Sequence, residues 1–518
     1  MAAGPADAVR RAYLILAAFV AGASVMIIEL AGNRVLAPWF GNSLYTWTGL
    51  IGVILVSLSG GYYLGGYLAD RRPSYAVLAH LLAASAVLTI LVPSLQSSID
   101  GPLRTWDVIS GPLAATTLLF ALPGCLLAAV SPFAIRMISL LSADRRVGLA
   151  AGSVGMAATL GSVLGTFATG FVLVPHLRLR AIFVATGLVL AVLAVAGYVL
   201  FAGFRRRKSL AALLLGLFTL VAAVAYLDEK PRSPRIIYEE QTFYHRIRVV
   251  EQEAGEPGDR LRHLYLDNTR EGSQYARSKA LWEGYQRYWE LARLFSADVK
   301  KAAFLGGGAY AMPEALLDAY PEAAVDVVEI DPAVIEVGRK FFRVDQYPRM
   351  NAVADDARRF LQSTDARYDL IYGDAYRGVA CIPAHLVTVE FFRLVRSRLN
   401  NRGVFIINVS GSIEGERARL FHSVARTLSE VFSHQCVFAT RPDSPQEAQN
   451  VFVVAADHDL KPESLSADAF EHPERIAKLL SGYVPPDRYD LSGGFVFSDD
   501  HNPVEYLVAR SLAASGAR

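Results

Sequence analysis

The stretch that decides the fold is Ala302–Gly338, AAFLGGGAYAMPEALLDAYPEAAVDVVEIDPAVIEVG. Its pattern predicts a short apolar strand, a glycine turn, a helix and a second strand that ends at Glu329. Gly306, Gly307 and Gly308 lie at the carboxyl end of the first strand, where a side chain would block a ligand. Glu329 lies where a carboxylate accepts hydrogen bonds from ribose hydroxyls. The combination predicts a nucleoside pocket, and the absence of a G-K-[ST] sequence excludes a P-loop.

The segment after Lys301 alternates between strand and helix patterns, which predicts a parallel sheet with helices on both faces. The last two strands are joined by RPDSPQEAQ, which is too short for a full helix. The final strand is therefore expected to run antiparallel, as in a class I methyltransferase-like Rossmann fold. The expected strands are 302–305, 324–330, 351–354, 368–373, 403–409, 435–440 and 450–456.

Carboxylates follow two more of these strands. Asp355 and Asp356 come after the third strand, where an adenine amino group would fall in this fold, and Asp374 comes after the fourth, beside the reacting centre. Because an unpaired buried acid is costly, a binding or catalytic role is favoured over packing. The alternative for Asp374 is that it caps the segment that follows.

A small antiparallel β region precedes the Rossmann-like domain. RIIYEEQTFYHRIRVVEQ and RLRHLYLDN carry β-prone residues on either side of the turn AGEPGD, as in a hairpin. The expected domains are a transmembrane domain at 1–230, the β part at 231–270 and the Rossmann-like catalytic domain at 271–518.

The first 230 residues have a membrane composition, and the whole chain is 53% hydrophobic. Seven apolar runs are long enough for spans, which take about 20 residues each. The fifth is dense in small residues, which favours close helix packing. We find no tandem repeat. The expected spans lie near 12–31, 47–68, 76–96, 113–133, 149–174, 179–203 and 209–227.

Loop charges predict that the N-terminus is cytoplasmic, because arginines and lysines crowd the loops on that side. Seven spans would then place the C-terminal half outside, and one span fewer would place it inside. Glu29 is the ionisable residue deepest within an expected span. Such a residue is a functional candidate, although an ion pair with the nearby Arg34 is an equal alternative.

Charge and cysteine content exclude several classes of protein. The formal net charge of +2 argues against a nucleic-acid partner, which requires a basic face. The three cysteines, Cys125, Cys381 and Cys436, lie far apart without ligand spacing, so neither a metal site nor a disulfide framework is expected.

Several motifs resemble those of spermidine synthases, the polyamine aminopropyltransferases. They are TFYHRIRVVE, LYLDN, FLGGGAYAMPEALL, VVEIDPAVIEVGRKFF, DARRFL, YDLIYGDAY, IPAHLVTVEFF and SDDHNPVEYL, and they cover most of 235–505. More specifically, the motifs resemble those of bacterial proteins in which such a domain follows a multi-span membrane region. This resemblance implies a multi-pass protein of the bacterial inner membrane, a polyamine substrate and a homodimer. It implies no cofactor, with decarboxylated S-adenosylmethionine as co-substrate.

The resemblance also assigns residues. It places Glu329 on the ribose, Asp356 on the adenine, and Asp374 as the base that deprotonates the attacking amine. Asp267, Gln274 and Tyr376 are the candidate substrate-binding residues.

Two positions depart from the family pattern. Ala309 stands where the family has the Asp that binds the donor's free amine, and Arg377 stands where it has a second Asp after the catalytic one. Asp267, Glu271, Asp499 and Asp500 are candidates to restore the lost acidity. Ordinary S-adenosylmethionine therefore stays possible as donor. The alternatives are a methyl or aminocarboxypropyl transferase and a non-catalytic transporter or sensor that binds a polyamine or nucleoside.

Overall fold

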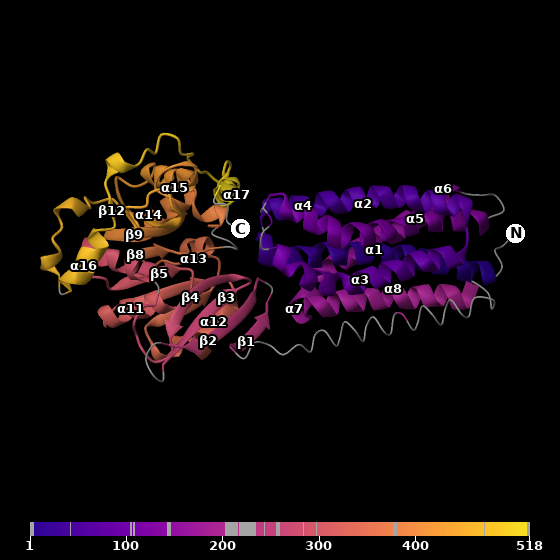
Figure 1. Cartoon of the computed structure of the whole chain (residues 1–518), viewed down its shortest axis with the longest axis horizontal. Helices are drawn as coiled ribbons and strands as arrows, with labels where there is room; N and C mark the ends of the chain where they lie inside the picture. Colours follow the sequence, from indigo (N-terminus) through magenta and orange to yellow (C-terminus); the bar gives the residue numbers. More distant parts are fainter. Residues whose placement is uncertain are drawn as a thin grey trace. The chain divides into compact units, whose positions relative to one another are not determined.

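The computed structural model describes residues 5–41, 43–103, 106, 109–141, 147–201, 216, 235–242, 244–254, 259–282, 284–296, 298–376, 381–470 and 472–514. The chain divides into two compact units, Met1–Arg232 and Ser233–Ala517 (Figure 1). The first unit is helical and the second contains all of the described strands.

The helical unit contains six described helices that are long and apolar enough to cross a membrane. The fourth and fifth spans each include a π-helical segment, Thr117–Ala121 and Thr169–Leu173 respectively. The expected seventh span at 209–227 lies outside the described residues. The helices are α1 (Pro5–Phe40), α2 (Leu44–Arg71), α3 (Tyr75–Leu103), α4 (Gly111–Thr116), α5 (Leu122–Leu141), α6 (Val147–Ala168), α7 (Val174–His176) and α8 (Leu179–Phe201).

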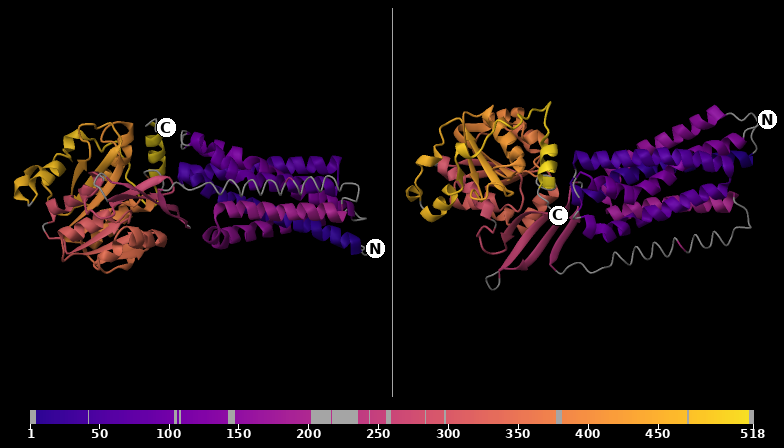
Figure 2. Two further views of the ribbon diagram at one scale, coloured as in Figure 1. Left: turned by 60° about the horizontal axis from the view of Figure 1, so that its bottom comes forward. Right: turned by 45° about the horizontal axis from the view of Figure 1, so that its top comes forward.

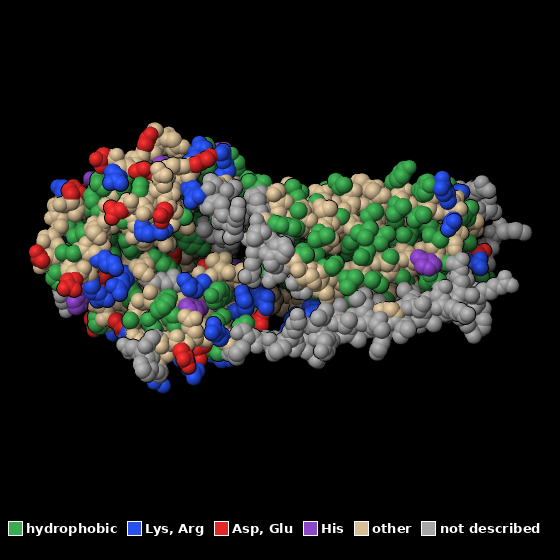
Figure 3. Space-filling model, viewed as in Figure 1, with side chains coloured by type: hydrophobic (Ala, Val, Ile, Leu, Met, Phe, Trp, Pro, Cys, Tyr) green, Lys and Arg blue, Asp and Glu red, His purple; other side chains and the backbone are tan. Residues whose placement is uncertain are grey.

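The helices of this unit run side by side in all three views (Figures 1 and 2). Hydrophobic side chains cover the flank of the bundle that faces the viewer in Figure 3. Exposed large apolar residues are numerous on α2, α6 and α8, which a soluble protein would bury. They include Leu55, Val56, Leu160, Leu164, Phe167, Val189, Val192, Val199 and Leu200.

The second unit begins with a four-stranded antiparallel sheet in the order β1-β2-β3-β4. Its strands are β1 (Ile236–Gln241), β2 (Arg246–Glu253), β3 (Arg260–Leu266) and β4 (Thr269–Tyr275). The expected boundary between residues 270 and 271 is wrong, because it falls inside β4. The sequence of β4 is polar and contains a glycine, so hydrophobic periodicity did not predict this strand.

An eight-stranded sheet follows, in the order β12-β10-β11-β9-β8-β5-β6-β7. The pairs from β9 to β7 are parallel, whereas β11 is antiparallel to both β9 and β10. This is the class I methyltransferase-like Rossmann fold expected from the sequence. Its strands are β5 (Lys301–Leu305), β6 (Ala324–Glu329), β7 (Met350–Ala354), β8 (Tyr368–Gly373), β9 (Leu399–Gly411), β10 (His434–Ala439), β11 (Gln449–Ala456) and β12 (Tyr483–Val484).

Two buried clusters cover the two faces of this sheet, because successive strand residues point to opposite faces. Ala303 and Leu305 of β5 pack with the helices α13, α14, α15 and α17, whereas Phe304 packs with α10, α11, α12 and α16. Figure 1 shows α14 and α15 on one side and α11 and α12 on the other. The helices are α10 (Leu291–Phe295), α11 (Ala311–Ala319), α12 (Pro332–Phe341), α13 (Ala357–Ser363), α14 (Val389–Arg398), α15 (Arg419–Ser429), α16 (Pro473–Leu480) and α17 (Val504–Ala514).

Candidate active site

The glycine turn joins β5 to α11 and is supported from below by Glu329. Gly306 and Gly308 have φ values of +111° and +49°, which side chains disfavour. The backbone N–H of Gly307 donates to Oε2 of Glu329 at 3.1 Å, and the N–H of Asp331 donates to Oε1 at 3.1 Å. Burial raises the pKa of Glu329 although these two hydrogen bonds lower it. The carboxylate thus fixes the turn, and its contact with a ribose stays a prediction.

Strand β4 of the small sheet crosses directly over the glycine turn. A Cβ at Gly272 would lie 2.9 Å from Cβ of Ala309, and a Cβ at Gly308 would lie 3.2 Å from the carbonyl oxygen of Glu271. Ala309 is consequently buried beneath β4. An Asp at position 309 would have no room for its larger side chain, because Gly272 of β4 lies directly against Cβ of Ala309.

Glu271 is the acid that β4 brings to this place. The pKa of Glu271 is raised to about 8, chiefly by burial and also by the neighbouring carboxylates Asp374, Glu329 and Asp267, against the opposing effect of His245. Its carboxylate makes no hydrogen bond or ion pair within the described part of the chain. The four acids therefore form a site with excess negative charge, which attracts a cation.

Asp374 follows β8 and lies beside the glycine turn. Its backbone N–H donates to the carbonyl of Leu305, and a Cβ at Gly306 would lie 2.5 Å from its carbonyl oxygen. Nδ2 of Asn408 donates to Oδ1 of Asp374 at 2.9 Å, and Nδ2 of Asn450 donates to Oδ1 of Asn408 at 3.1 Å. Two amides from β9 and β11 therefore orient this carboxylate.

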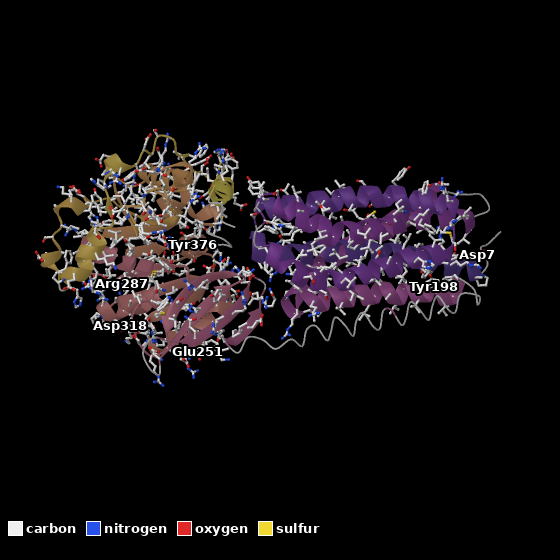
Figure 4. All side chains as sticks on the ribbon, in the orientation of Figure 1. Asp7, Tyr198, Glu251, Arg287, Asp318 and Tyr376 are labelled. Carbon is white, nitrogen blue, oxygen red and sulfur yellow. The ribbon has the colours of Figure 1, made fainter. Side chains whose placement is uncertain are left out.

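Tyr376, labelled in Figure 4, comes from the loop after β8. Its hydroxyl donates to the carbonyl of Asn408 at 2.8 Å and accepts from the N–H of Ser410 at 3.1 Å. Burial, together with Asp374, raises the pKa of Tyr376 well above its ordinary value. The hydroxyl ties the loop to β9, so any substrate contact of Tyr376 would be through its ring. Arg377 lies outside the described residues.

Asp356 caps the N-terminus of α13, since its Oδ1 accepts from the N–H groups of Arg358 and Arg359, both at 3.0 Å. Its Oδ2 lies 2.8 Å from Nε2 of His385, which lowers the pKa of Asp356. The adenine contact stays a prediction. Sequence patterns did not single out His385.

The other expected substrate-binding residues differ in their surroundings. Asp267 has a φ of +54° in the turn between β3 and β4, and its carboxylate binds the N–H of Arg246 and Nδ1 of His245. Gln274 is buried and donates to Oε2 of Glu314 at 2.7 Å, on the first turn of α11. Asp267 belongs to the acidic group around Glu271, whereas the amide of Gln274 holds α11 against β4.

Asp499 of the SDD motif does not add free charge to this group. Both carboxylate oxygens of Asp499 bind Arg358, at 2.7 and 2.6 Å, and Thr388 also donates to Asp499. Asp499 is therefore neutralised by Arg358, whereas Glu271 is the acid of β4 that borders the glycine turn. Among the described residues, no group of three or more His, Cys, Asp or Glu side chains is arranged to hold a metal.

The strand order, the glycine turn and the acids at the strand ends define a Rossmann-like domain of the class that binds adenosyl sulfonium compounds. Residues 289–462 match the family model described as "Spermine/spermidine synthase domain". These residues form a spermine/spermidine synthase domain, and the chain is a transferase.

Two curated relatives match beyond the soluble unit. "Polyamine aminopropyltransferase" of Corynebacterium efficiens is 27% identical over 445 residues, which cover 80% of each chain. "Polyamine aminopropyltransferase 2" of Aquifex aeolicus is 23% identical over 433 residues, which cover 80% of this chain and 82% of the relative. Both alignments are longer than the soluble unit and extend into the helical unit. The human "eEF1A lysine and N-terminal methyltransferase" is 34% identical over 116 residues, 20% of this chain and 16% of that protein.

Proposed function

We propose that the chain is a membrane-anchored polyamine aminopropyltransferase. It moves the aminopropyl group of decarboxylated S-adenosylmethionine to putrescine or a similar amine and releases 5′-methylthioadenosine. The observation that carries this proposal is the position of Asp374, held by Asn408 beside the glycine turn and within an acidic group. The spermine/spermidine synthase domain at residues 289–462 supports the same donor and reaction.

Asp374 acts as the general base in this proposal. An ammonium ion has no free electron pair, so the acceptor amine first loses a proton to the carboxylate. The amine nitrogen then attacks the carbon bonded to the sulfonium sulfur. A carbon–nitrogen bond forms, the carbon–sulfur bond breaks, and its electron pair neutralises the sulfonium. Asn408 and the glycine turn contribute by holding base and donor in line.

Glu271 takes the place of the acid that Ala309 lacks. It borders the glycine turn from β4, and no described partner neutralises it. Glu271 is protonated near neutral pH in the unliganded site, and an ammonium group of the donor beside it would favour its ionised form. The carboxylate of ordinary S-adenosylmethionine would instead be repelled by the neighbouring ionised acids and by Glu271 once it is ionised. Asp267 and Glu329 add to the field that attracts the cation.

A product assay on the detergent-purified full chain tests the proposal. The chain receives decarboxylated or ordinary S-adenosylmethionine, each with putrescine or spermidine, and the released nucleoside is identified by mass. Methylthioadenosine and a longer polyamine from the decarboxylated donor are expected. Asp374→Asn should lower kcat by about 100-fold or more, since general-base catalysis contributes roughly 10²–10⁴. Asp487→Asn, on the exposed segment after β12, is the matched control.

A transfer from ordinary S-adenosylmethionine is the second candidate. It is favoured by the buried Ala309, because the family's donor-selecting Asp is absent from this position. S-adenosylhomocysteine as product would mean methyl transfer, and methylthioadenosine from the carboxylated donor would mean aminocarboxypropyl transfer. Nucleoside or polyamine binding without any product would leave the binding-module alternative.

We also propose that the helical unit spans the bacterial inner membrane, with a cytoplasmic N-terminus. The six apolar helices and their exposed apolar side chains support a lipid environment. A homodimer, implied by the family, stays a prediction for size-exclusion chromatography with light scattering.

A further inference from the structure

The helical unit contains an internal repeat in its packing. Its six spans form three principal pairs: the first with the fifth (α1 with α6), the second with the fourth (α2 with α5) and the third with the sixth (α3 with α8). Exchanging the first three spans with the last three converts the first pair into the second and leaves the third unchanged. Other contacts obey the same rule, since α3 packs on α5 as α8 packs on α1. The six described spans therefore form two copies of one three-helix packing motif.

Glycines set the direction of the pair α1–α6. A Cβ at Gly161 would lie 2.0 Å from the carbonyl oxygen of Phe19, and a Cβ at Gly165 would lie 2.5 Å from that of Ala23. Both residue numbers increase together, so the two helices run parallel. Their backbones touch at positions four residues apart, which only glycine permits.

The pair α2–α5 repeats this contact. A Cβ at Gly61 would lie 2.1 Å from the carbonyl oxygen of Cys125, and a Cβ at Gly65 would lie 2.2 Å from that of Ala129. The direction and the spacing are those of the first pair. A motif of three spans ends on the opposite side of the bilayer from its start, so the second motif is inverted relative to the first. Inverted repeats are typical of secondary transporters, whose binding sites lie near the bilayer midplane at the repeat interface.

Glu29 lies on α1, well inside the span, and its side chain is partly buried. It is about 16 Å from the end of the helix at Phe40, at 1.5 Å per residue. It makes no hydrogen bond or ion pair with any described residue, so the ion pair with Arg34 that the sequence allowed is not formed. A carboxylate without a partner in a span is costly, and it marks a functional site by default.

Glu29 lies on α1 between its contacts with the fifth and the fourth span, both of which belong to the other repeat. On one side, a Cβ at Gly22, two turns before Glu29, would lie 2.2 Å from the carbonyl oxygen of Ala158 on α6. Gly32 lies one turn after Glu29, and a Cβ there would lie 3.2 Å from the ring of Phe120. Phe120 belongs to the π-helical segment Thr117–Ala121, and such segments are frequent at functional sites. One turn before Phe120, the hydroxyl of Thr116 is fully buried and has no hydrogen-bond partner among the described residues.

We propose that the helical unit is an inverted-repeat transport bundle in which Glu29 binds an organic ammonium ion between the two repeats. The carboxylate neutralises the cation, and the unpartnered hydroxyl of Thr116 offers an acceptor farther along the same interface. The choice of an amine rests on the proposed function of the soluble unit. The bundle and the soluble site would then act on the same class of molecule.

Covalent labelling of Glu29 tests the binding site. The full chain in lipid nanodiscs is treated with dicyclohexylcarbodiimide, which modifies carboxyl groups in apolar surroundings, and the peptide containing Glu29 is quantified by mass spectrometry. We expect modification of Glu29 that falls at least several-fold in the presence of putrescine, but not with sodium chloride at equal ionic strength. Asp70→Asn is the matched control and should leave the labelling of Glu29 unchanged, because Asp70 is exposed and paired with Arg136. An unmodified Glu29, or modification that putrescine leaves unchanged, would overturn the proposal.

Uptake of radiolabelled putrescine tests transport. Proteoliposomes contain the Asp374→Asn chain, so that turnover in the soluble site does not contribute. Uptake above protein-free liposomes is expected, and Glu29→Gln in the same background should abolish it while the chain still elutes as a single species. Uptake that does not depend on Glu29 would reject the transport role. Because labelling reads one peptide and the product assay reads the nucleoside, failure of either proposal is distinguishable from failure of the other.

Discussion

Glu271 links the chemistry of the soluble site to pH. Its pKa is raised from 4.5 to about 8 in the folded chain, so it is protonated near neutral pH when folded and ionised when unfolded. The folded state therefore binds more protons between these two values, and stability falls as pH rises through this window. The contribution is fully present below about 4.5 and is lost as pH passes about 8.

The expected result is a melting temperature that decreases from pH 5.5 to pH 8.5. Glu271→Gln should flatten this dependence, because Gln does not titrate. Thermal unfolding of the full chain in detergent measures both. Glu322→Gln, an exposed acid, is the control that should keep the wild-type slope. An unchanged slope in Glu271→Gln would contradict a perturbed Glu271.

Donor selection is a second consequence of Glu271. If its carboxylate receives the ammonium group of the donor, Glu271→Gln should raise KM for the decarboxylated donor by roughly 10- to 100-fold, as the loss of a charged hydrogen bond of about 1.5–3 kcal/mol implies. Relative use of ordinary S-adenosylmethionine should increase. Steady-state kinetics with both donors measure the ratio. A ratio that does not move would assign donor selection to another residue.

Asn408 is expected to position Asp374 without touching the substrate. Asn408→Ala removes the amide that donates to Oδ1 and should lower kcat roughly 10- to 100-fold, since small misplacements of a base cost about that much. KM for the donor should stay close to wild type, which separates positioning from a general loss of fold. Asn401→Ala, exposed near the start of the same strand β9, is the matched control.

At the scale of elements, α12 is fixed against the glycine turn by Tyr310. Tyr310 has a φ of +60° and is buried, and a Cβ at Gly338 would lie 2.5 Å from Cε2 of its ring. Gly338→Ala should therefore lower the free energy of unfolding by about 1–3 kcal/mol, the usual cost of overpacking. Chemical denaturation of the full chain measures it. Gly284→Ala, where a Cβ meets nothing within 4 Å, should be close to neutral.

The Rossmann-like sheet was predictable because its pattern is local. The expected strands β5 to β8 agree with the structure within one residue at either end, since apolar runs and turn residues mark them. The length of the preceding loop alone predicted that β11 runs antiparallel, and the structure confirms this direction. In contrast, β9 begins at Leu399, in a polar stretch without a strand signal, and β12 has two residues only.

The site was predictable only where a residue is tied to a strand end. Glu329 and Asp374 follow strands, so their meeting at one edge follows from the topology. Glu271 was merely one of several candidate acids, because its importance depends on β4 crossing the glycine turn. His385 and Asn408 come from distant elements, and no local pattern indicates what they contact.

At the scale of the whole molecule, the repeat in the helical unit is visible in the packing of its helices but not in the sequence. The two three-span motifs share packing but no visible sequence repeat, since lipid-facing positions accept any apolar residue. The equivalence lies in which backbones touch, at Gly61 and Gly65 in one motif and Gly161 and Gly165 in the other.

The orientation of the chain in the membrane follows from the positions of its positively charged residues. Arg10, Arg11, Arg71 and Arg72 lie at the ends of the first two spans that we place in the cytoplasm. Six described spans return the chain to the side from which it started, and that side holds the cytosolic donor. We therefore expect the soluble unit to be cytoplasmic.

Single cysteines in a chain whose three native cysteines are replaced by serine test this orientation. A membrane-impermeant maleimide added to intact cells should label Leu44→Cys at the start of α2. It should label Pro73→Cys, between α2 and α3, only after permeabilisation, because that loop lies on the opposite side. Ser492→Cys reports on the soluble unit and should behave like Pro73→Cys. Labelling of Ser492→Cys in intact cells would place the soluble unit outside. The donor would then have to be supplied across the membrane, and the 209–227 run would have to be counted as a seventh span.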